Sequence, residues 1–239
     1  MRKIEVLRSD RGSSSSASED RILSLPEKRI VVLADGFGGP VAGAQAAEKV
    51  CSAIHQFLIQ EAGDLEATLP FVMRSYFSLA GNVLFNALVH ANRLLSGANA
   101  GKSVHEKGGA SVVAAYLDGE ILSIASVGSC SAWFFREGRK ISLLTPRTWG
   151  RLIDPSSGGN TPEARLPLMA LGVSEDLEPE VLDIRVQAGD RIWLGSFDPE
   201  ADELATLGRL DFRAPAVESF SMISDTYTSD RTWVLWGIS

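Results

Sequence analysis

The chain has 239 residues, of which 45% are hydrophobic and 22% are charged, the balance of an ordinary globular protein with a substantial core. Its formal net charge is −7 and it contains no run of Lys and Arg, which argues against a protein that binds nucleic acid through phosphates. We expect a single domain over residues 1–239.

Two features of the sequence bear on the compartment. Cys51 lies in a helical pattern and Cys130 in a strand pattern, so neither a disulfide framework nor a zinc site is supported. The first ten residues are charged, and no later run reaches the roughly 18 apolar residues that a membrane-spanning helix requires. We expect reduced thiols, no membrane association and a cytoplasmic protein.

The N-terminal part predicts two short strands and two helices. The strands Ile4–Leu7 and Arg21–Leu25 flank the serine-rich loop Ser13–Ser16. Apolar residues at helical spacing then predict a core-facing helix over Val41–Ala62. A second stripe predicts a helix from about Phe71 to Leu95, before the stop signal of a glycine.

After residue 107 the sequence is rich in strands. Asp118-Gly119 and Glu137-Gly138 match two-residue hairpin turns, so the strands on either side should be antiparallel neighbours. Two helices among many antiparallel strands indicate an α+β domain rather than a parallel, alternating architecture. The predicted strands are Ala110–Leu117, Glu120–Val127, Ala132–Arg136, Lys140–Leu144, an apolar pair of Glu180–Val186 and Arg191–Leu194 around Gly189, and Thr232–Ile238.

The segment IVVLADGFGG, from Ile30 to Gly39, places a carboxylate directly after a predicted strand. Ile30–Leu33 are apolar, as in a strand buried on both faces, and the glycines after Asp35 permit backbone angles that other residues resist. A carboxylate at a sheet edge beside such a turn is where a hard cation finds an oxygen ligand. The same residues also fit an ordinary strand end with an Asp in its turn.

Several short motifs follow one another in a recognisable order. They are SDRGSSSSASED from Ser9 to Asp20, then ADGFGG, GGASVVAAYLDG and SVGSCSAWFFREG, and finally LMALGVSEDLEPEVLDIRVQAGDRIWLGS from Leu168 to Ser196. As an ordered set across nearly the whole chain, they resemble the metal-dependent serine/threonine protein phosphatases of type 2C, the PPM family.

The resemblance implies a fold and a chemistry. The fold would be two antiparallel sheets packed as a sandwich with flanking helices, in four layers α/β/β/α. In that family two divalent cations, usually Mn²⁺ or Mg²⁺, activate a water that attacks phosphoserine or phosphothreonine. By position, Asp35 matches the bridging aspartate and Gly36 the residue whose carbonyl binds metal, while Glu19 and Asp20 match acids that hold metal-bound waters. We expect Asp35 close to Glu19 or Asp20.

Other positions of the family pattern are substituted in this sequence. The arginine that binds phosphate is replaced by a serine, which cannot make a bidentate contact to phosphate. The central metal aspartate falls at a phenylalanine, and no imidazole is available from the glycine turn. The substituted positions are Ser15, Ser129, Phe197, Ala201 and Ser229.

A shifted register would restore some of these ligands. Asp198 and Asp202 reproduce the four-residue spacing of the family's acids if one residue bulges out before Asp198, and Asp230 is one place from the final ligand. A one-residue slip turns side chains to the opposite face, so this alternative requires real β-bulges.

Three readings of the function follow. The first is a pseudophosphatase that acts in signalling by binding a protein partner such as a kinase or phosphoprotein, with no cation or one weakly bound Mg²⁺ or Mn²⁺. The second is an active enzyme with a two-metal centre built from the displaced acids. The third is a scaffold without phosphate recognition. The short segment Thr145–Arg165 stands where the family has a mobile flap, so we expect an open site.

Overall fold

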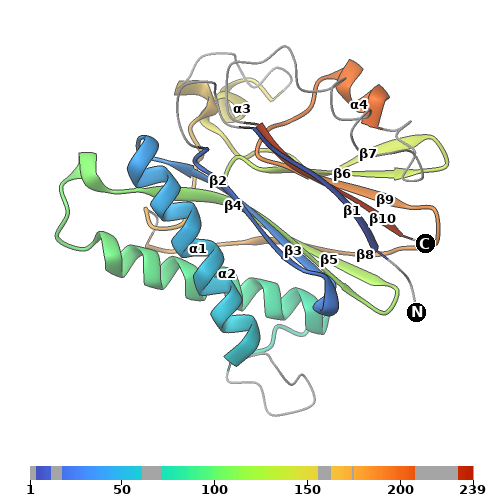
Figure 1. Cartoon of the computed structure of the whole chain (residues 1–239), viewed down its shortest axis with the longest axis horizontal. Coiled ribbons are helices and arrows are strands. Elements are labelled where there is room, and N and C mark those ends of the chain that lie inside the picture. The colour runs from blue at the N-terminus through green and yellow to red at the C-terminus, as the bar shows by residue number, and fades with distance from the viewer. Residues whose placement is uncertain are drawn as a thin grey trace.

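Two five-stranded antiparallel sheets pack face to face in the computed structural model of the chain (Figure 1). The structure describes residues 4–11, 18–60, 71–155, 163–173, 175–207 and 231–238. We call the sheets A and B. Sheet A has the order β1 (Ile4–Arg11), β10 (Arg231–Ile238), β9 (Arg191–Gly195), β6 (Ser131–Arg136) and β7 (Arg139–Leu144), and sheet B has the order β2 (Asp20–Leu25), β3 (Ile30–Phe37), β4 (Gly109–Asp118), β5 (Ile121–Val127) and β8 (Glu180–Arg185).

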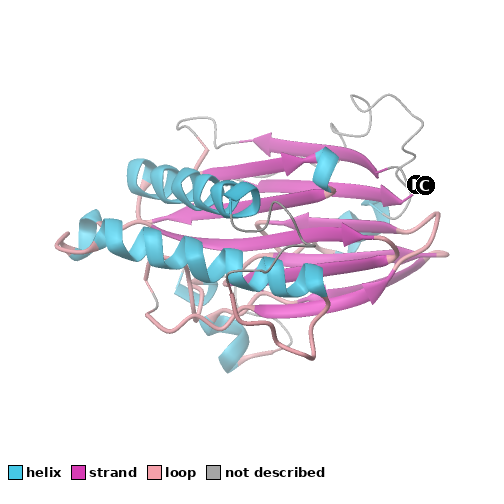
Figure 2. Cartoon of the chain, turned by 90° about the horizontal axis from the view of Figure 1, so that it is seen from below, coloured by secondary structure: helices cyan, strands magenta, loops and turns pink. Residues whose placement is uncertain are grey.

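Four layers are present, as the resemblance implied. Helices α1 (Pro40–Gln60) and α2 (Leu79–Asn99) lie across the outer face of sheet B (Figure 2). On the outer face of sheet A, α4 (Ala201–Leu207) packs on a cluster that includes Phe135, Trp193 and Trp233, here called the outer aromatic cluster. The remaining helices are α3 (Trp149–Ile153) and the short 3₁₀ turns η1 (Pro26–Lys28), η2 (Val104–Glu106) and η3 (Glu163–Arg165).

Sheet B is buried on both faces. In β3, Ile30 and Val32 pack against the helices, whereas Val31 and Leu33 pack between the sheets. This explains the continuous apolar run of β3, since both faces of the strand meet hydrophobic neighbours. Residues 30–33, for which burial was expected, are buried, as are residues 112–115, 122–125 and 192–194, whereas Ile121 is half-buried.

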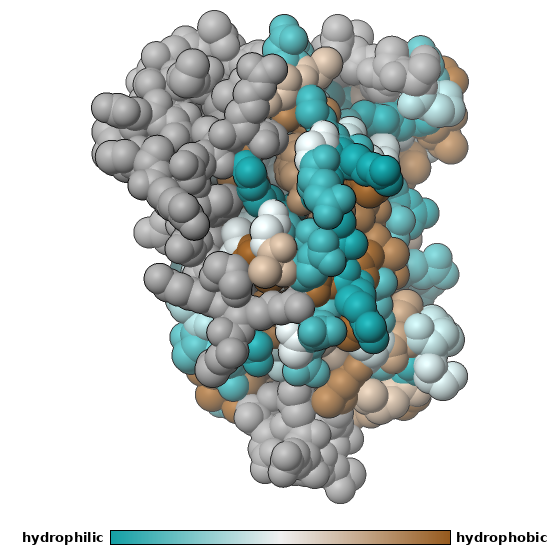
Figure 3. Space-filling view, turned by 90° about the vertical axis from the view of Figure 1, so that its right-hand side faces the viewer, coloured by the Kyte–Doolittle hydropathy of each residue, from teal (hydrophilic) through white to brown (hydrophobic). Residues whose placement is uncertain are grey.

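The predicted hairpin turns are present. Asp118-Gly119 joins β4 to β5 and Glu137-Gly138 joins β6 to β7, with positive φ at Gly119, Glu137 and Gly138. Every strand pair of the described residues is antiparallel, which confirms the α+β class. The end of the sandwich that carries the hairpin turns presents a band of hydrophilic residues beside hydrophobic ones (Figure 3).

The second helix was predicted to begin too early. It begins at Leu79, because Ser78 is its N-cap and accepts a hydrogen bond from the Gly81 N–H (2.9 Å). The Asn82 side chain accepts from the Arg74 N–H (2.6 Å) and donates to the Arg74 carbonyl (3.0 Å), which folds the preceding loop onto the helix. No helix in the described ranges is long and apolar enough to span a membrane.

In two cases, predicted strands that follow one another in the sequence lie in different sheets. Residues 180–185 form β8, which pairs with β5 in sheet B, whereas β9 pairs with β10 and β6 in sheet A. The turn between them is held from both sides, because the Val186 N–H donates to Glu120 and the Gly189 N–H donates to Ile238. In the same way β1 pairs with β10, and β2 pairs with β3.

Candidate functional site

Acidic and hydroxyl side chains meet at one end of sheet B, in the space between the sheets. Asp35 is directly opposite Asp20 on β2 and opposite Ser111 on β4. Residues opposite one another in antiparallel strands project to the same face. That face is the inner one, because Leu33, two residues before Asp35, packs between the sheets. Asp20 is buried, whereas Asp35 is half-buried.

Glu19 is directed to the other side of this sheet, toward α1. A Cβ atom built on Gly43 in α1 would lie 2.1 Å from Glu19 Oε2, so the carboxylate lies directly over the helix backbone. A Cβ on Gly36 would likewise lie 2.1 Å from the Gly43 carbonyl oxygen. Glycine at both positions therefore permits the first turn of α1 to approach the end of β3. Asp20, rather than Glu19, shares a face with Asp35.

Neutral hydroxyls occupy the neighbouring turn. Ser129, at the position of the family's aspartate, lies 2.9 Å from Ser111 through the two Oγ atoms, and the Ser129 N–H donates to Ser111 Oγ (3.1 Å). Next to it, Cys130 is buried, and this burial together with the charges of Asp35 and Asp20 raises the pKa of its thiol well above the ordinary value. The thiol is therefore protonated at neutral pH.

Asp198, an acid of the shifted register, is bound by two neighbouring side chains. Trp133 Nε1 donates to Asp198 Oδ1 (3.0 Å), and Arg151 of α3 forms an ion pair with Asp198 Oδ2. Trp133 packs against the outer aromatic cluster of sheet A, so Asp198 is held beside that cluster. Asp35, in contrast, faces the space between the sheets. The strand pairing of β9 with β10 and β6 runs through Gly195 without a register shift.

Phe197 occupies the position of the family's central metal aspartate. Its ring packs edge-on against Trp193 (5.2 Å between centroids), and the Arg231 guanidinium lies 4.0 Å from the ring centroid. Its backbone carbonyl accepts a hydrogen bond from Ser131 Oγ (2.6 Å). The ring and the backbone carbonyl of Phe197 are therefore both engaged in structural contacts.

The remaining predicted positions are spread over the chain. Ala201 and Asp202 are exposed in the first turn of α4. Ser15, Ser229 and Asp230 lie outside the described residues. Within the ranges that the structure describes, no group of three or more His, Cys, Asp or Glu residues is arranged to hold a metal ion. The structure thus brings together Asp35, Asp20 and Gly36, with Glu19 behind them, and holds Asp198 elsewhere.

The sequence was compared with family models and with known proteins. No family model matches the sequence. The serine/threonine protein phosphatase PstP of Mycobacterium tuberculosis is 30% identical over an alignment of 207 residues, which covers 82% of this chain and 37% of PstP. The chain thus spans little more than a third of the length of this relative.

Solved structures share the fold at lower identity. The catalytic domain of PstP in complex with two manganese ions superposes with a TM-score of 0.77 at 21% identity, over 100% of this chain and 99% of that domain. The phosphatase Stp1 of Staphylococcus aureus gives a TM-score of 0.79 at 16% identity, over 99% and 95% of the two chains. PppA of Pseudomonas aeruginosa gives 0.78 at 20% identity, over 99% and 98%.

The four-layer sandwich, with an aspartate and a glycine turn at the inner end of β3, defines a protein of the metal-dependent phosphatase fold. The sequence similarity to PstP over most of the chain agrees with that fold. The sequence similarity and the shared fold together support membership of the PPM family of serine/threonine protein phosphatases.

A two-metal centre does not fit the described side chains of this chain. A pair of divalent cations requires several oxygen ligands whose charges neutralise it. Asp35 and Asp20 supply two carboxylates, but Phe197 supplies an aromatic ring and Asp198 is already neutralised by Arg151.

Sequence reasoning missed the Arg151 contact. Arg151 and Asp198 are 47 residues apart, and no motif links them. The only local signal is an arginine within a short apolar segment that replaces the flap. A pairing of this kind is set by the tertiary fold and has no periodic signature in the sequence.

Proposed function

We propose that this chain is a pseudophosphatase, a PPM-fold protein that does not hydrolyse phosphoesters and acts by binding a protein partner such as a kinase or phosphoprotein. The observation that carries the proposal is the ion pair between Arg151 and Asp198. The guanidinium of Arg151 is paired with the carboxylate that the shifted register would use as a metal ligand. This internal cation balances the charge of Asp198, so a metal ion is not needed to do so. Phe197 at the regular position adds no ligand.

An exposed apolar surface supports the partner-binding half of the proposal. It comprises side chains of α3 and of the segment after η3, and we call it the α3 patch: Trp149, Leu152, Ile153, Leu166 and Leu168. The backbone joins the two parts, because the Trp149 N–H donates to the Leu166 carbonyl (3.0 Å). Ile153 is 82% exposed and Leu152 is 61% exposed, although both are large and hydrophobic. Grouped exposed hydrophobic residues typically mark interaction sites.

The patch and the ion pair belong to the same short helix. Arg151 points inward to Asp198, while Leu152 and Ile153 remain exposed. The ion pair therefore fixes α3 on the body of the protein and presents its apolar residues in one orientation. A preformed surface of this kind binds at a lower cost in conformational entropy than a mobile flap would.

The activity half is tested by an assay of phosphopeptide and aryl-phosphate hydrolysis with Mn²⁺. We expect the wild-type chain to show no more metal-dependent turnover than Asp35→Asn does. This comparison is decisive because metal-assisted hydrolysis is the chemistry that this fold offers. Metal-dependent turnover that is lost in Asp35→Asn would refute the pseudophosphatase. The same assay on Asp198→Asn would then show whether the active enzyme uses the shifted register, since only that register makes Asp198 a ligand.

The partner half is tested by affinity purification from the native host with the wild-type chain and with Leu152→Asp/Ile153→Asp. We expect a protein that copurifies with the wild type and is lost from the double variant. Val72→Asp is the matched control, because Val72 is 79% exposed and lies outside the α3 patch. Equal recovery with all three chains would exclude the α3 patch as the binding surface.

A further inference from the structure

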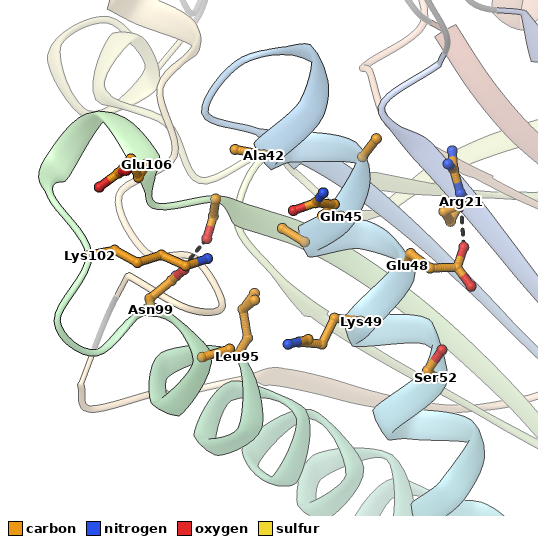
Figure 4. Close-up of a pocket in the computed structure, with 14 residues that line it drawn as sticks. Arg21, Ala42, Gln45, Glu48, Lys49, Ser52, Leu95, Asn99, Lys102 and Glu106 are labelled. Atoms are coloured by element: carbon orange, nitrogen blue, oxygen red, sulfur yellow. Dashed lines mark hydrogen bonds and ion pairs between the residues drawn. The ribbon is translucent and has the colours of Figure 1, made fainter.

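A pocket of about 540 Å³ opens between α1 and α2, on the helical layer that covers sheet B (Figure 4). This volume is in the range of small-molecule sites, which is roughly 300–1,000 Å³. Its base is apolar and buried, and consists chiefly of Leu95 and Ala46. Asn99 fixes the base, because its side-chain amide donates to the carbonyls of Gly108 (2.7 Å) and Gly172 (3.0 Å).

Two ammonium groups converge over this base. Figure 4 shows Lys49 reaching in from α1 and Lys102 from the segment after α2, so that their amino groups point toward the same space from opposite sides. The Gln45 side chain is directed into that space from α1. Two ammonium groups that face one space favour an anionic group between them.

The two acidic side chains that line the pocket are engaged by neighbouring groups. For Glu106 the hydrogen bonds from Ser103 lower the pKa of the carboxyl, and the charge of Lys102 adds to this effect. Glu48 forms an ion pair with Arg21 (3.1 Å), on the far side of α1 from Lys49. Glu106 accepts hydrogen bonds from the hydroxyl and the backbone N–H of Ser103 (2.7 and 3.0 Å). Within the described part of the chain, Lys49 forms no ion pair. The positive charge that faces the pocket is thus only partly balanced by the protein.

We propose that this pocket binds a small organic anion, with its carboxylate, phosphate or sulfonate between Lys49 and Lys102 and its apolar body on Leu95 and Ala46. The two ammonium groups favour an anionic group on the ligand. The apolar base favours a ligand that also has an apolar body over a bare inorganic ion. The side-chain amide of Gln45 adds a polar group to the pocket lining. The proposal does not require hydrolysis at Asp35.

The test uses anilinonaphthalene sulfonate, a fluorescent probe with an apolar body and one anionic group, titrated into the full chain. Its neutral counterpart, N-phenylnaphthylamine, reports apolar binding without charge. We expect one saturable site for the sulfonate and at least tenfold weaker binding in Lys49→Gln/Lys102→Gln. Both lysines are exposed, so the double variant should fold normally.

Two further variants locate the site. Ala98→Phe should fill the pocket and weaken the probe at least tenfold without a change of charge, because Ala98 lines the pocket. Lys140→Gln removes an exposed lysine of β7 and should leave binding unchanged. Equal binding of the sulfonate to the wild type and to Lys49→Gln/Lys102→Gln would overturn the proposal. It would also be overturned if the neutral probe bound the wild type as tightly as the sulfonate does and lost the same affinity in the lysine variant.

Discussion

At the scale of single residues, Asp198 shows how a carboxylate can be retained in a fold while its chemistry is changed. Its two oxygens are bound by the indole of Trp133 and the guanidinium of Arg151. About a quarter of each charged side chain remains exposed, 26% for Arg151 and 24% for Asp198, so the pair is neither fully buried nor a free surface contact. Its energetic role is therefore structural and moderate.

The pair predicts a measurable coupling. Asp198→Asn and Arg151→Gln should each lower the free energy of unfolding by about 1 kcal/mol, because each leaves a partly buried charge without its partner. The double variant should lose less than the sum, with a coupling of about 0.5 to 1 kcal/mol in urea denaturation. Asp176→Asn, at an exposed position, is the control. Strictly additive losses would show that the contact is energetically silent.

A second residue-scale prediction concerns Cys51. Burial, with a smaller contribution from Glu48 and against the opposing effect of Arg21, raises the pKa of its thiol from 9.0 to about 12. The unfolded thiol ionises first, so the stability that Cys51 contributes is complete below about pH 9 and is lost as the pH rises toward 12. Wild type should lose stability between these values more steeply than Cys51→Ala, by up to about 1.4 kcal/mol per pH unit. Urea denaturation at several pH values measures both slopes, and identical slopes would contradict the shift.

At the scale of elements, the start of helix α2 is fixed by a carboxylate from strand β8. Asp183 on β8 accepts hydrogen bonds from the Ser78 N–H (2.6 Å), the Ser78 hydroxyl (2.9 Å) and the hydroxyl of Ser123 (2.6 Å). Ser78 is at the same time the N-cap of the helix. One side chain thus connects the helix terminus to the two neighbouring strands β5 and β8.

Removal of that carboxylate should destabilise the chain. Asp183→Ala leaves the Ser78 N–H and the buried Ser123 hydroxyl without their acceptor, at a cost of about 2 to 3 kcal/mol in urea denaturation. Asp183→Asn keeps an acceptor oxygen and should cost less. Hydrogen exchange should show the loss concentrated at the first turn of α2, near Gly81. Uniform loss of protection along α2 would instead indicate that Asp183 stabilises the core as a whole.

The elements show which parts of the fold sequence could predict. The hairpin turns at Asp118-Gly119 and Glu137-Gly138 were correctly predicted, because their backbone angles favour glycine and fix the neighbouring strands. The turn at Gly189 has the same local chemistry but connects strands of different sheets, since hydrogen bonds to Glu120 and Ile238 decide its strand partners. The start predicted for α2 was too early, because the helix start depends on a contact of Asn82 with Arg74 in the preceding loop and on a tertiary contact of Ser78 with Asp183, 105 residues away.

The same distinction applies to the candidate site. Asp35 and its glycine turn are local features, and the strand register places Asp20 opposite Asp35 as the resemblance implied. The position of Asp198 depends on Trp133 and Arg151, which are 65 and 47 residues away in sequence. Ligand sets assembled from distant segments therefore could not be predicted from sequence beyond the positions that match the family motif.

At the scale of the whole molecule, the two sheets divide the roles. Sheet B and its helices hold Asp35, Asp20 and the pocket with Lys49, whereas sheet A holds Asp198 beside the outer aromatic cluster. In the family both sheets would contribute ligands to the space between them. Here the contributions of sheet A among the described residues are directed to packing and to the attachment of α3.

That division predicts how the whole chain responds to metal. A ligand that binds only the folded state at about a thousand times its dissociation constant adds about 4 kcal/mol to the free energy of unfolding, so a complete micromolar site would give that gain at about 1 mM Mn²⁺. With Asp35 and Asp20 as the main described carboxylates, we expect a gain below about 1 kcal/mol, and none in Asp35→Asn. Urea denaturation with and without Mn²⁺ measures it, and Mg²⁺ serves as the second cation. A gain near 4 kcal/mol that Asp35→Asn abolishes would mean that residues outside the described ranges complete a metal centre, and the pseudophosphatase proposal would fail.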